Sequence, residues 1–390
     1  MVFTKPKDVR AAVMVKPGVM ELRTYPYPTI DKDSAIVRIE MCGVCGTDKH
    51  IFKGDTTQIR GKSPFPIING HEMIGTIVEI GENAAKSMEA DSKILEEGDR
   101  VAVAVEVNCG ECWYCKNMYD NITCENQVMA YGVHPTVDVP PHLRGGFAEY
   151  MYVFPNSVLF KIPEGMPTEV AVFVEEMAVA YSALARAVQP YPAIKEGFGP
   201  GDSVAILGNG PLGILHGIMT RIHGGGMSIA TDLAENRLEV ARKFYADFTI
   251  NAINTSSKER IQQVKDLTGG IGPDLVIEAA GEPQVFIEAL EMVRKGGTVI
   301  EVGNWVDREQ TIQLNVTKHV SSKNIHIHSV YHCGNVWGPV LKVLERYSGQ
   351  FPFEKLISHR MSLNEIVKHM DIVLDPNKCM KVEVVPYKEN

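Results

Sequence analysis

A glycine-rich turn placed between an apolar strand and an apolar helix constrains the fold of this chain most strongly. Residues 202–213 read DSVAILGNGPLG, in which Gly208, Gly210 and Gly213 form a G-x-G-x-x-G motif. Such glycines permit a tight turn, a close approach of the backbone to a pyrophosphate, and close packing of the helix on the strand. The helix N-terminus adds free N–H groups for the phosphates. In this strand–turn–helix context the motif, together with Leu212 inside it, predicts a dinucleotide-binding site.

Asp232 is the residue expected to bind the ribose of that dinucleotide. It ends the next apolar run, MSIATD, where an acidic side chain accepts hydrogen bonds from the ribose diol. Because its charge would repel a 2′-phosphate, the sequence favours NAD over NADP. Arg237 follows closely and would either soften that preference or stack beside the adenine. The structural alternative is a simple glycine-rich turn and an aspartate that caps the helix ENRLEVARKF.

The pattern of apolar residues predicts two domains in this chain of 390 residues. In the first part, short β-branched runs separated by Gly, Pro and Asp predict an antiparallel, partly barrel-like β domain. Later, short apolar strands alternate with amphipathic helices, which predicts an α/β domain with a doubly wound parallel sheet. We predict that residues 1–178 form the β domain, that 179–332 form the nucleotide-binding domain, and that 333–390 return to the first. Residues 83–98 and 133–145 look like surface insertions.

Four of the eight cysteines crowd into the segment CGECWYCKNMYDNITC. The N-terminal segment lacks an apolar stretch long enough for a signal peptide, so this cluster indicates a metal site rather than disulfides. Four soft thiolates suffice for a closed tetrahedral zinc site with no position for substrate. We predict a structural zinc in the loop 109–124, bound by Cys109, Cys112, Cys115 and Cys124. Free surface thiols and a redox role are the alternatives.

A second set of potential metal ligands is dispersed. Cys45 and His50 lie in CGVCGTDKH, and His71 and Glu72 follow in INGHEMIG. Taken alone, each histidine is more often a satisfied structural residue than a ligand, and Cys42 with Cys45 could form a C-x-x-C redox pair. The local sequence leaves these alternatives open.

The motifs GVCGTDKH, GHEMIG, the four-cysteine loop, GNGPLG and the aspartate after the following strand resemble, in this order, those of the zinc-dependent medium-chain alcohol and polyol dehydrogenases. GPDLVIEAAG and RKGGTVIEVG are similar to segments of that family's cofactor domain. The resemblance covers nearly the whole chain. It implies a GroES-like catalytic domain that includes the C-terminal tail, an inserted Rossmann domain, and zinc-assisted hydride transfer from a secondary alcohol, such as a polyol or sugar derivative, to NAD.

The resemblance also implies roles for individual residues. The family's catalytic-zinc positions correspond to Cys45, His71, Glu72 and Glu175. Glu175 aligns with the acidic residue of the polyol dehydrogenases, where many simple alcohol dehydrogenases have cysteine. Thr47 would receive the alcohol proton, and His50 would pass it, through the cofactor ribose, to solvent. Two zinc ions per chain, one catalytic and one structural, are therefore implied.

Composition excludes several other classes of function. The chain carries 48 acidic and 39 basic side chains, a formal net charge of −9, which argues against a dedicated binder of nucleic acid or anionic membranes. No apolar run approaches the length of a transmembrane helix, so we expect a cytoplasmic protein that acts on a small molecule. The resemblance implies a homo-oligomer, either a dimer or a tetramer.

The sequence leaves two other functions open. A zinc-free quinone or enone reductase on the same fold would have no need for Cys45, His71 and the acidic residues near them. A non-catalytic nucleotide-binding or lens-type structural protein would have no need for Thr47, His50 and an open metal site together. Zinc content and NADH production distinguish the three functions.

Overall fold

The two ends of the chain build one structural unit, and its middle builds the other. In the computed structural model, unit 1 comprises Met1–Glu175 and Gly334–Asn390, and unit 2 comprises Glu176–Cys333. The structure describes residues 4–55, 63–91, 93–118, 123–134, 136–188, 195–304 and 310–388. Each unit has its own cluster of buried apolar side chains.

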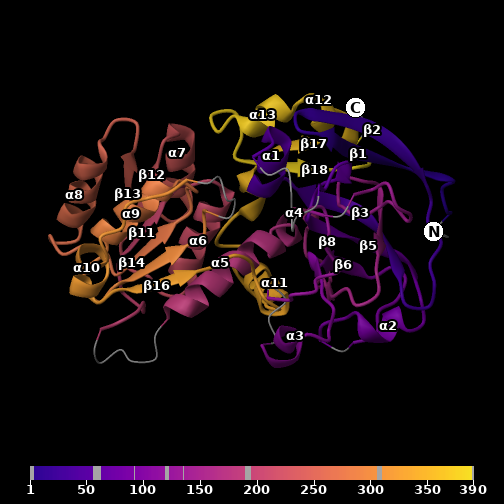
Figure 1. Cartoon of the computed structure of the whole chain (residues 1–390), viewed down its shortest axis with the longest axis horizontal. Helices are drawn as coiled ribbons and strands as arrows, with labels where there is room; N and C mark the ends of the chain where they lie inside the picture. The colour runs from indigo at the N-terminus through magenta and orange to yellow at the C-terminus, as the bar shows by residue number, and fades with distance from the viewer. Residues whose placement is uncertain are drawn as a thin grey trace. The chain divides into compact units, whose positions relative to one another are not determined.

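Unit 2 is a doubly wound α/β domain, as the sequence predicted (Figure 1). Its six described strands run parallel in the order β13-β12-β11-β14-β15-β16. They are β11 (Val204–Leu207), β12 (Ser228–Asp232), β13 (Phe248–Asn251), β14 (Leu275–Glu278), β15 (Thr298–Glu301) and β16 (His326–Ser329). All residues of β11 and β14 are buried, which is typical of strands covered on both faces.

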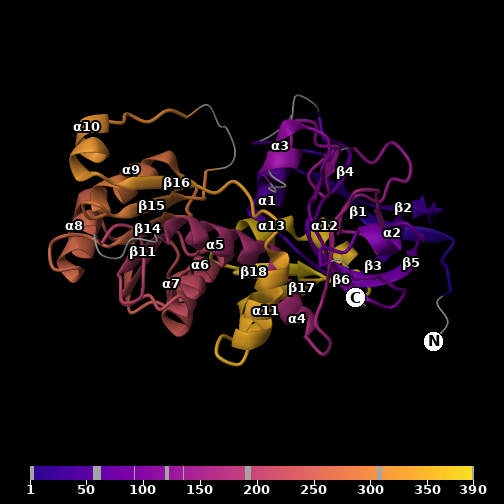
Figure 2. The same cartoon turned by 90° about the horizontal axis from the view of Figure 1, so that it is seen from below.

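Helices cover both faces of this sheet. Figure 2 shows α9 on one side of the strands and α6 and α7 on the other. The helices are α5 (Val174–Ala187), which begins in unit 1, α6 (Pro211–Ile222), α7 (Glu235–Phe244), α8 (Ser257–Leu267), α9 (Pro283–Met292) and α10 (Val316–His319). Gly210 caps α6 and Pro211 opens it, so the predicted glycine motif forms the turn between β11 and α6.

Unit 1 is built mainly from β-sheets. Its seven-stranded sheet has the order β10-β6-β5-β3-β18-β17, with β9 also paired to β3; a second sheet has the order β2-β1-β4, and β7 pairs with β8. The strands are β1 (Asp8–Lys16), β2 (Val19–Pro26), β3 (Ala35–Gly43), β4 (Ile67–Ile68), β5 (Glu72–Ile80), β6 (Arg100–Val103), β7 (Glu106–Val107), β8 (Met129–Ala130), β9 (Tyr150–Val153), β10 (Leu159–Lys161), β17 (Ile357–Met361) and β18 (Lys381–Val384). The last of these, β18, pairs antiparallel with β3, so the C-terminal tail completes a sheet begun near the N-terminus.

Short helices connect the strands of unit 1. They are α1 (Gly46–Lys53), α2 (Ala84–Ser87), α3 (Trp113–Asn117), α4 (Thr168–Ala171), α11 (Trp337–Tyr347), α12 (Leu363–Lys368) and α13 (Met370–Leu374). Of these, α1 and α3 position potential metal ligands, because each begins directly after a cysteine, Cys45 and Cys112 respectively.

The strands β17 and β18 pair parallel, and α12 and α13 supply the long crossover connection that a parallel pair requires. One expectation about unit 1 needs correction. The segments 83–98 and 133–145 are not purely surface insertions. The first contributes the buried side chains of Met88 and Leu95 to the core, and the second contributes that of Leu143.

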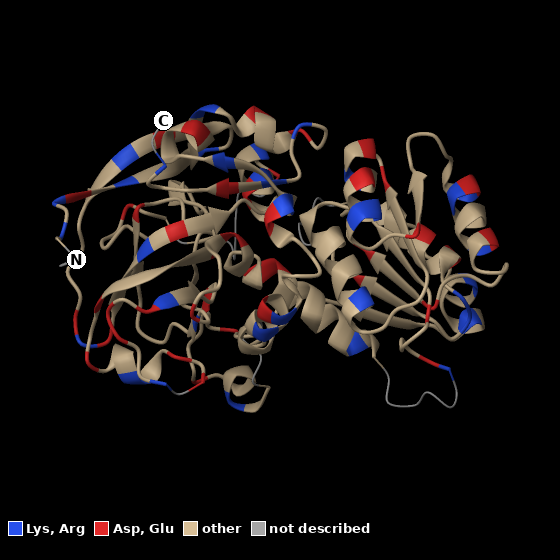
Figure 3. Ribbon diagram, turned by 180° about the vertical axis from the view of Figure 1, so that it is seen from behind, with Lys and Arg blue, Asp and Glu red and all other residues tan. Residues whose placement is uncertain are grey.

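The surface charges of both units are mixed. Figure 3 shows acidic and basic residues interspersed along the helices and loops of each unit. No helix within the described parts of the chain combines the length and apolar character needed to cross a membrane.

Candidate functional site

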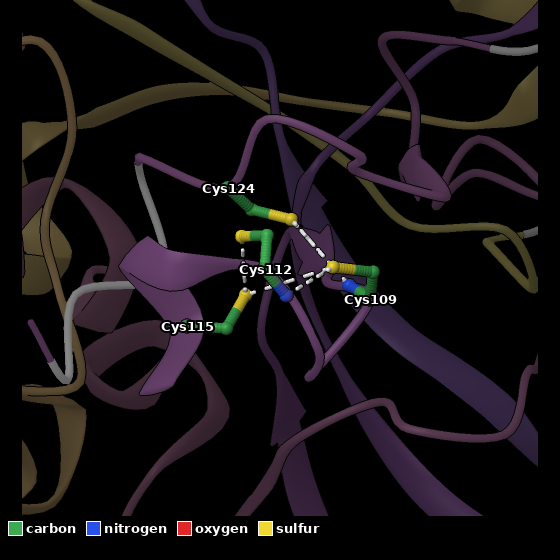
Figure 4. A group of neighbouring side chains, drawn as sticks. All are labelled: Cys109, Cys112, Cys115 and Cys124. Carbon is green, nitrogen blue, oxygen red and sulfur yellow. Dashed lines mark hydrogen bonds between the residues drawn. The ribbon is translucent and has the colours of Figure 1, made fainter. Parts of the chain in front are cut away.

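The four clustered cysteines converge on one point of unit 1. Figure 4 shows their sulfur atoms turned toward one another around the start of α3. The Sγ of Cys109 lies 3.5 Å from that of Cys124 and 3.9 Å from that of Cys115, and the Cys112 and Cys115 sulfurs are 3.5 Å apart. All four sulfurs lie within 4.8 Å of one another. This spacing fits four thiolates around a single tetrahedral zinc ion.

The local backbone favours thiolates in this loop. The pKa of Cys112 is lowered to about 6, first by a hydrogen bond with the backbone of Cys115. The pKa of Cys109 is also lowered, because the backbone N–H groups of Glu111 and Cys112 donate to its sulfur. In contrast, burial raises the pKa of Cys115 to about 12, with its sulfur neighbours adding to the rise. The lowered pKa values of Cys109 and Cys112 favour their thiolate forms, which are the forms that bind a metal ion. Binding of the ion would displace the protons of the other two thiols.

Cys45, His71 and Glu72 form the second potential metal centre. Their ligand atoms all lie within 4.8 Å of one another, and they come from the residue before α1, the residue before β5 and the first residue of β5. Asp48 links the two segments: its Oδ2 accepts from the backbone N–H of Cys45 at 2.9 Å, and its Oδ1 lies 3.9 Å from His71 Nδ1. The dispersed sequence motifs are therefore brought together in the fold.

The electrostatics of this centre fit a cation. Burial raises the pKa of Cys45 well above its usual value, and the carboxylates of Glu72 and Glu175 raise it further. Burial alone would lower the pKa of His71, but the charges of Asp48, Glu175 and Glu72 outweigh it and raise the pKa. Two buried polar atoms, His71 Nδ1 and Glu72 Oε1, have no hydrogen-bond partner within the described residues. A divalent metal would neutralise this negative site and supply a partner for Glu72 Oε1.

Lys381 is the positive group that the structure places beside this centre. Its ammonium group forms an ion pair with Glu72 Oε2, and both side chains are only 1% exposed. Lys381 is the first residue of β18, which the pairing with β3 brings to the metal centre. The sequence analysis missed Lys381, as it missed Asp48. The only signal for Lys381 was a lysine that alternates with valine in the tail strand KVEV.

Thr47 and His50 lie on α1 and are separated by one helical turn. The Thr47 hydroxyl is 3.6 Å from the sulfur of Cys45. His50 Nδ1 is 2.7 Å from Asp55 Oδ2, and the His50 side chain is 29% exposed. Glu175 is buried, and its charge affects Cys45 and His71. However, Glu175 does not belong to the group of Cys45, His71 and Glu72 whose ligand atoms lie within 4.8 Å of one another.

The predicted nucleotide residues meet at the carboxyl ends of β11 and β12 in unit 2. Gly208 has a φ of 90°, and a Cβ there would lie 2.6 Å from the backbone nitrogen of Ala280, so only glycine fits. A Cβ at Gly213 would overlap the carbonyl oxygen of Gly208. Asp232 is buried at the end of β12, and the Arg237 guanidinium lies 3.9 Å from its Oδ2. Leu212 lies in the first turn of α6.

A pair of neighbouring acids at the same edge of the sheet, of which Glu278 is completely buried, was not predicted. Glu278 and Glu301 are register partners at the ends of β14 and β15, and Asn304 Nδ2 donates to both carboxylates. Burial and the neighbouring Glu301 raise the pKa of Glu278 to about 8. An acidic residue at the end of each of two neighbouring strands was the signal that could have revealed this pair.

Two protein-family models and a curated relative match this chain. Residues 31–164 match the model of the alcohol dehydrogenase GroES-like domain, and residues 211–346 match that of zinc-binding dehydrogenases. The sorbitol dehydrogenase of Bacillus subtilis is 30% identical over 388 residues, covering 99% of each chain.

Solved structures show the same similarity. The alcohol dehydrogenase of Thermotoga maritima superposes with a TM-score of 0.85 at 27% identity, covering 97% of this chain and 99% of its own. A short-chain alcohol dehydrogenase of Escherichia coli CFT073, complexed with NADH, has a TM-score of 0.78 at 26% identity, covering 97% of this chain and 100% of its own.

Proposed function

This chain belongs to the family of zinc-dependent medium-chain alcohol and polyol dehydrogenases, and from that premise we propose that it oxidises a polyol-type secondary alcohol with NAD, reversibly giving the ketone. The observation that carries the proposal is the Cys45–His71–Glu72 cluster, in which His71 and Glu72 are buried and each has a polar atom without a hydrogen-bond partner among the described residues. A zinc-free reductase on this scaffold would have no reason to bury such a set. Nor would a non-catalytic nucleotide-binding protein.

The residues of the cluster have distinct tasks in this proposal. Cys45 and His71 hold the catalytic zinc, with Glu72 and Glu175 as carboxylate donors close by. When bound, zinc would act as a Lewis acid on the alcohol oxygen, and the nicotinamide would accept the hydride. Asp48 orients His71 and fixes the start of α1 through the backbone of Cys45. A carboxylate-rich shell is harder than a thiolate-rich one and suits substrates with neighbouring hydroxyl groups.

Proton removal is assigned to Thr47 and His50. Thr47, next to the Cys45 sulfur, would accept the proton of the alcohol. His50, one turn along α1 and partly exposed, would release it to solvent. The hydrogen bond between His50 Nδ1 and Asp55 Oδ2 holds the His50 ring in one orientation.

Replacing Glu175 tests its assignment to the catalytic zinc. We expect Glu175→Ala to lower zinc occupancy or turnover severely, because its buried charge lies close enough to affect both Cys45 and His71. Glu176→Ala is the matched control, since Glu176 is also buried in α5. Metal analysis and turnover measurements should show a clearly smaller loss for Glu176→Ala. Equal losses would remove Glu175 from the zinc site.

Replacing Asp232 tests the cofactor preference. We expect Asp232→Ser to shift the ratio of kcat/KM for NAD over NADP toward NADP by about tenfold or more, because a charge-assisted hydrogen bond and a repulsive charge are lost together. Arg237, close to the Asp232 carboxylate, would then be available to a 2′-phosphate. The ratio cancels any general loss of stability. An unchanged ratio would mean that another residue binds the ribose.

A substrate panel tests the proposed function itself. Sugar alcohols, cyclitols and simple secondary alcohols are compared with NAD at alkaline pH, while NADH formation is recorded. Oxidation of the polyhydroxylated compounds is the expected result. Oxidation of only monohydroxylic alcohols would refute the polyol assignment but not the dehydrogenase assignment, and the absence of zinc from active protein would refute the mechanism.

Location and assembly are also part of the proposal. None of the eight cysteines, all of which lie among the described residues, forms a disulfide, which supports a reducing compartment such as the cytoplasm. A homo-oligomer, dimer or tetramer, is proposed from family membership, with a small-molecule alcohol or ketone as the binding partner. Light scattering of the purified protein would determine the number of subunits.

A further inference from the structure

A buried tyrosine lies beneath the nucleotide-binding turn of unit 2. We propose that Tyr245, acting through Asn209, is a positioning residue that holds Asp232 and the turn around Gly208 in the conformation that binds the adenosine part of NAD. The proposal rests on the proposed function, which assigns these residues to NAD. It concerns cofactor affinity and not the chemical step.

Asn209 joins the ends of two neighbouring strands. Its side-chain Nδ2 donates to the carbonyl oxygen of Thr231 at 3.0 Å and to that of Ile206 at 3.3 Å. Thr231 belongs to β12 and Ile206 to β11, and the side chain of Asn209 is completely buried. The amide thus links the two strands at the edge where the dinucleotide is expected.

Asn209 also orients the ribose-binding carboxylate directly. Its backbone N–H donates to Asp232 Oδ2 at 2.6 Å, while the backbone N–H of Ala234 donates to Asp232 Oδ1 at 2.8 Å. Each carboxylate oxygen is therefore fixed by one main-chain donor. Movement of Asn209 would release one of these two oxygens and rotate the carboxylate.

Tyr245 completes the hydrogen bonding of Asn209. The Tyr245 hydroxyl donates to Asn209 Oδ1, and the tyrosine is buried directly after α7. The ring lies against α6 at Gly217, where any Cβ would overlap it. The Tyr245 side chain therefore depends on two neighbours. The absence of a side chain at Gly217 leaves room for its ring, and Asn209 accepts the hydrogen bond of its hydroxyl.

Removing the hydroxyl should loosen the turn without unfolding it. Tyr245→Phe leaves Asn209 Oδ1 as a buried acceptor without a donor, so the side chain is expected to shift and Asp232 with it. We expect the dissociation constant and KM for NAD to rise about tenfold, the equivalent of one lost hydrogen bond in a buried network. The kcat at saturating NAD should stay within about twofold, because neither residue belongs to the Cys45 cluster.

Tyr131→Phe is the matched control. Tyr131 is a completely buried tyrosine of unit 1 whose hydroxyl pairs with Ser157 Oγ at 2.7 Å and accepts from the backbone N–H of Phe154 at 2.7 Å. Removal of the Tyr131 hydroxyl breaks comparable hydrogen bonds in a part of unit 1 that does not belong to the nucleotide-binding turn. Gly217→Ala is a second test variant, because the added methyl group displaces the Tyr245 ring while its hydroxyl is retained.

The experiment measures equilibrium NAD binding, KM, kcat and thermal unfolding for the wild type and the three variants. The proposal is supported if Tyr245→Phe and Gly217→Ala weaken NAD binding with kcat preserved, while Tyr131→Phe affects only stability. It is overturned if the wild type binds NAD and Tyr245→Phe binds it equally well, or if kcat falls as far as affinity. Failure of the wild type to bind NAD would instead refute the proposed function, and this inference with it.

Discussion

Mild chelation is expected to abolish turnover while the fold remains intact. The four thiolates of Cys109, Cys112, Cys115 and Cys124 would enclose a zinc ion completely, whereas the proposed Cys45 centre must keep a position open for substrate. The open site therefore loses its zinc first. Because a Lewis acid contributes several kcal/mol to such a reaction, we expect the rate to fall by about a thousandfold or more. Metal analysis, turnover and circular dichroism are measured on the same samples.

Adding back zinc and replacing Cys45 provide the controls for this experiment. Zinc returned to the chelated protein should restore turnover, because the ligands remain folded around the vacant position. Cys45→Ser should behave like the chelated protein and keep the zinc of the four-cysteine loop. If turnover survives complete removal of the labile metal, the assignment of the Cys45 cluster is wrong.

Replacing Lys381 with methionine is expected to lower the free energy of unfolding by about 3–5 kcal/mol. Lys381 and Glu72 are each 1% exposed, so the variant leaves a buried carboxylate without its cation. Lys86→Met is the matched control, since its pairing with Glu82 is exposed and screened by solvent, so its loss is expected to leave the stability almost unchanged. Denaturant unfolding of both variants, in protein from which the labile metal has been removed, measures the difference.

A double variant identifies the cause of that loss. If the unpaired charge of Glu72 destabilises Lys381→Met, then adding Glu72→Gln should recover a large part of the stability. If the stability recovers, the unpaired charge of Glu72 causes most of the loss, and the lost packing of the lysine stem contributes little to it. A Lys381→Met variant as stable as Lys86→Met would show that the buried ion pair contributes no net stability.

The parts of the site that the sequence predicted have a local signature. GNGPLG, the four-cysteine loop and the aspartate after the second strand of the nucleotide domain are each short, and backbone geometry or ligand chemistry restricts them to few residue types. The alternation of apolar strands and helices likewise predicted the parallel sheet of unit 2. These features could be recognised without knowledge of the fold.

The remaining parts depend on contacts between distant segments. Asp48 resembles a polar helix residue, and Lys381 a surface lysine, until the pairing of β3 with β18 brings Lys381 to Glu72. Tyr245 and Asn209 meet only because α7 returns the chain to the turn before α6. The segment 83–98 was taken for a surface insertion because it is rich in polar residues, yet Met88 and Leu95 are buried. Polar composition does not exclude a few apolar anchors.

The position of β18 determines the order in which the chain can fold. Glu72 and Lys381 are 309 positions apart, and β18 pairs with β3 inside the sheet of unit 1. During synthesis, the strands of the metal-binding half leave the ribosome long before the strand that neutralises Glu72. Unit 2, contained in one continuous stretch of chain, is made complete in the meantime. Unit 1 must therefore wait with an unfinished sheet and an unpaired acid until β18 emerges, so the unit that carries the Cys45 cluster is the last to mature.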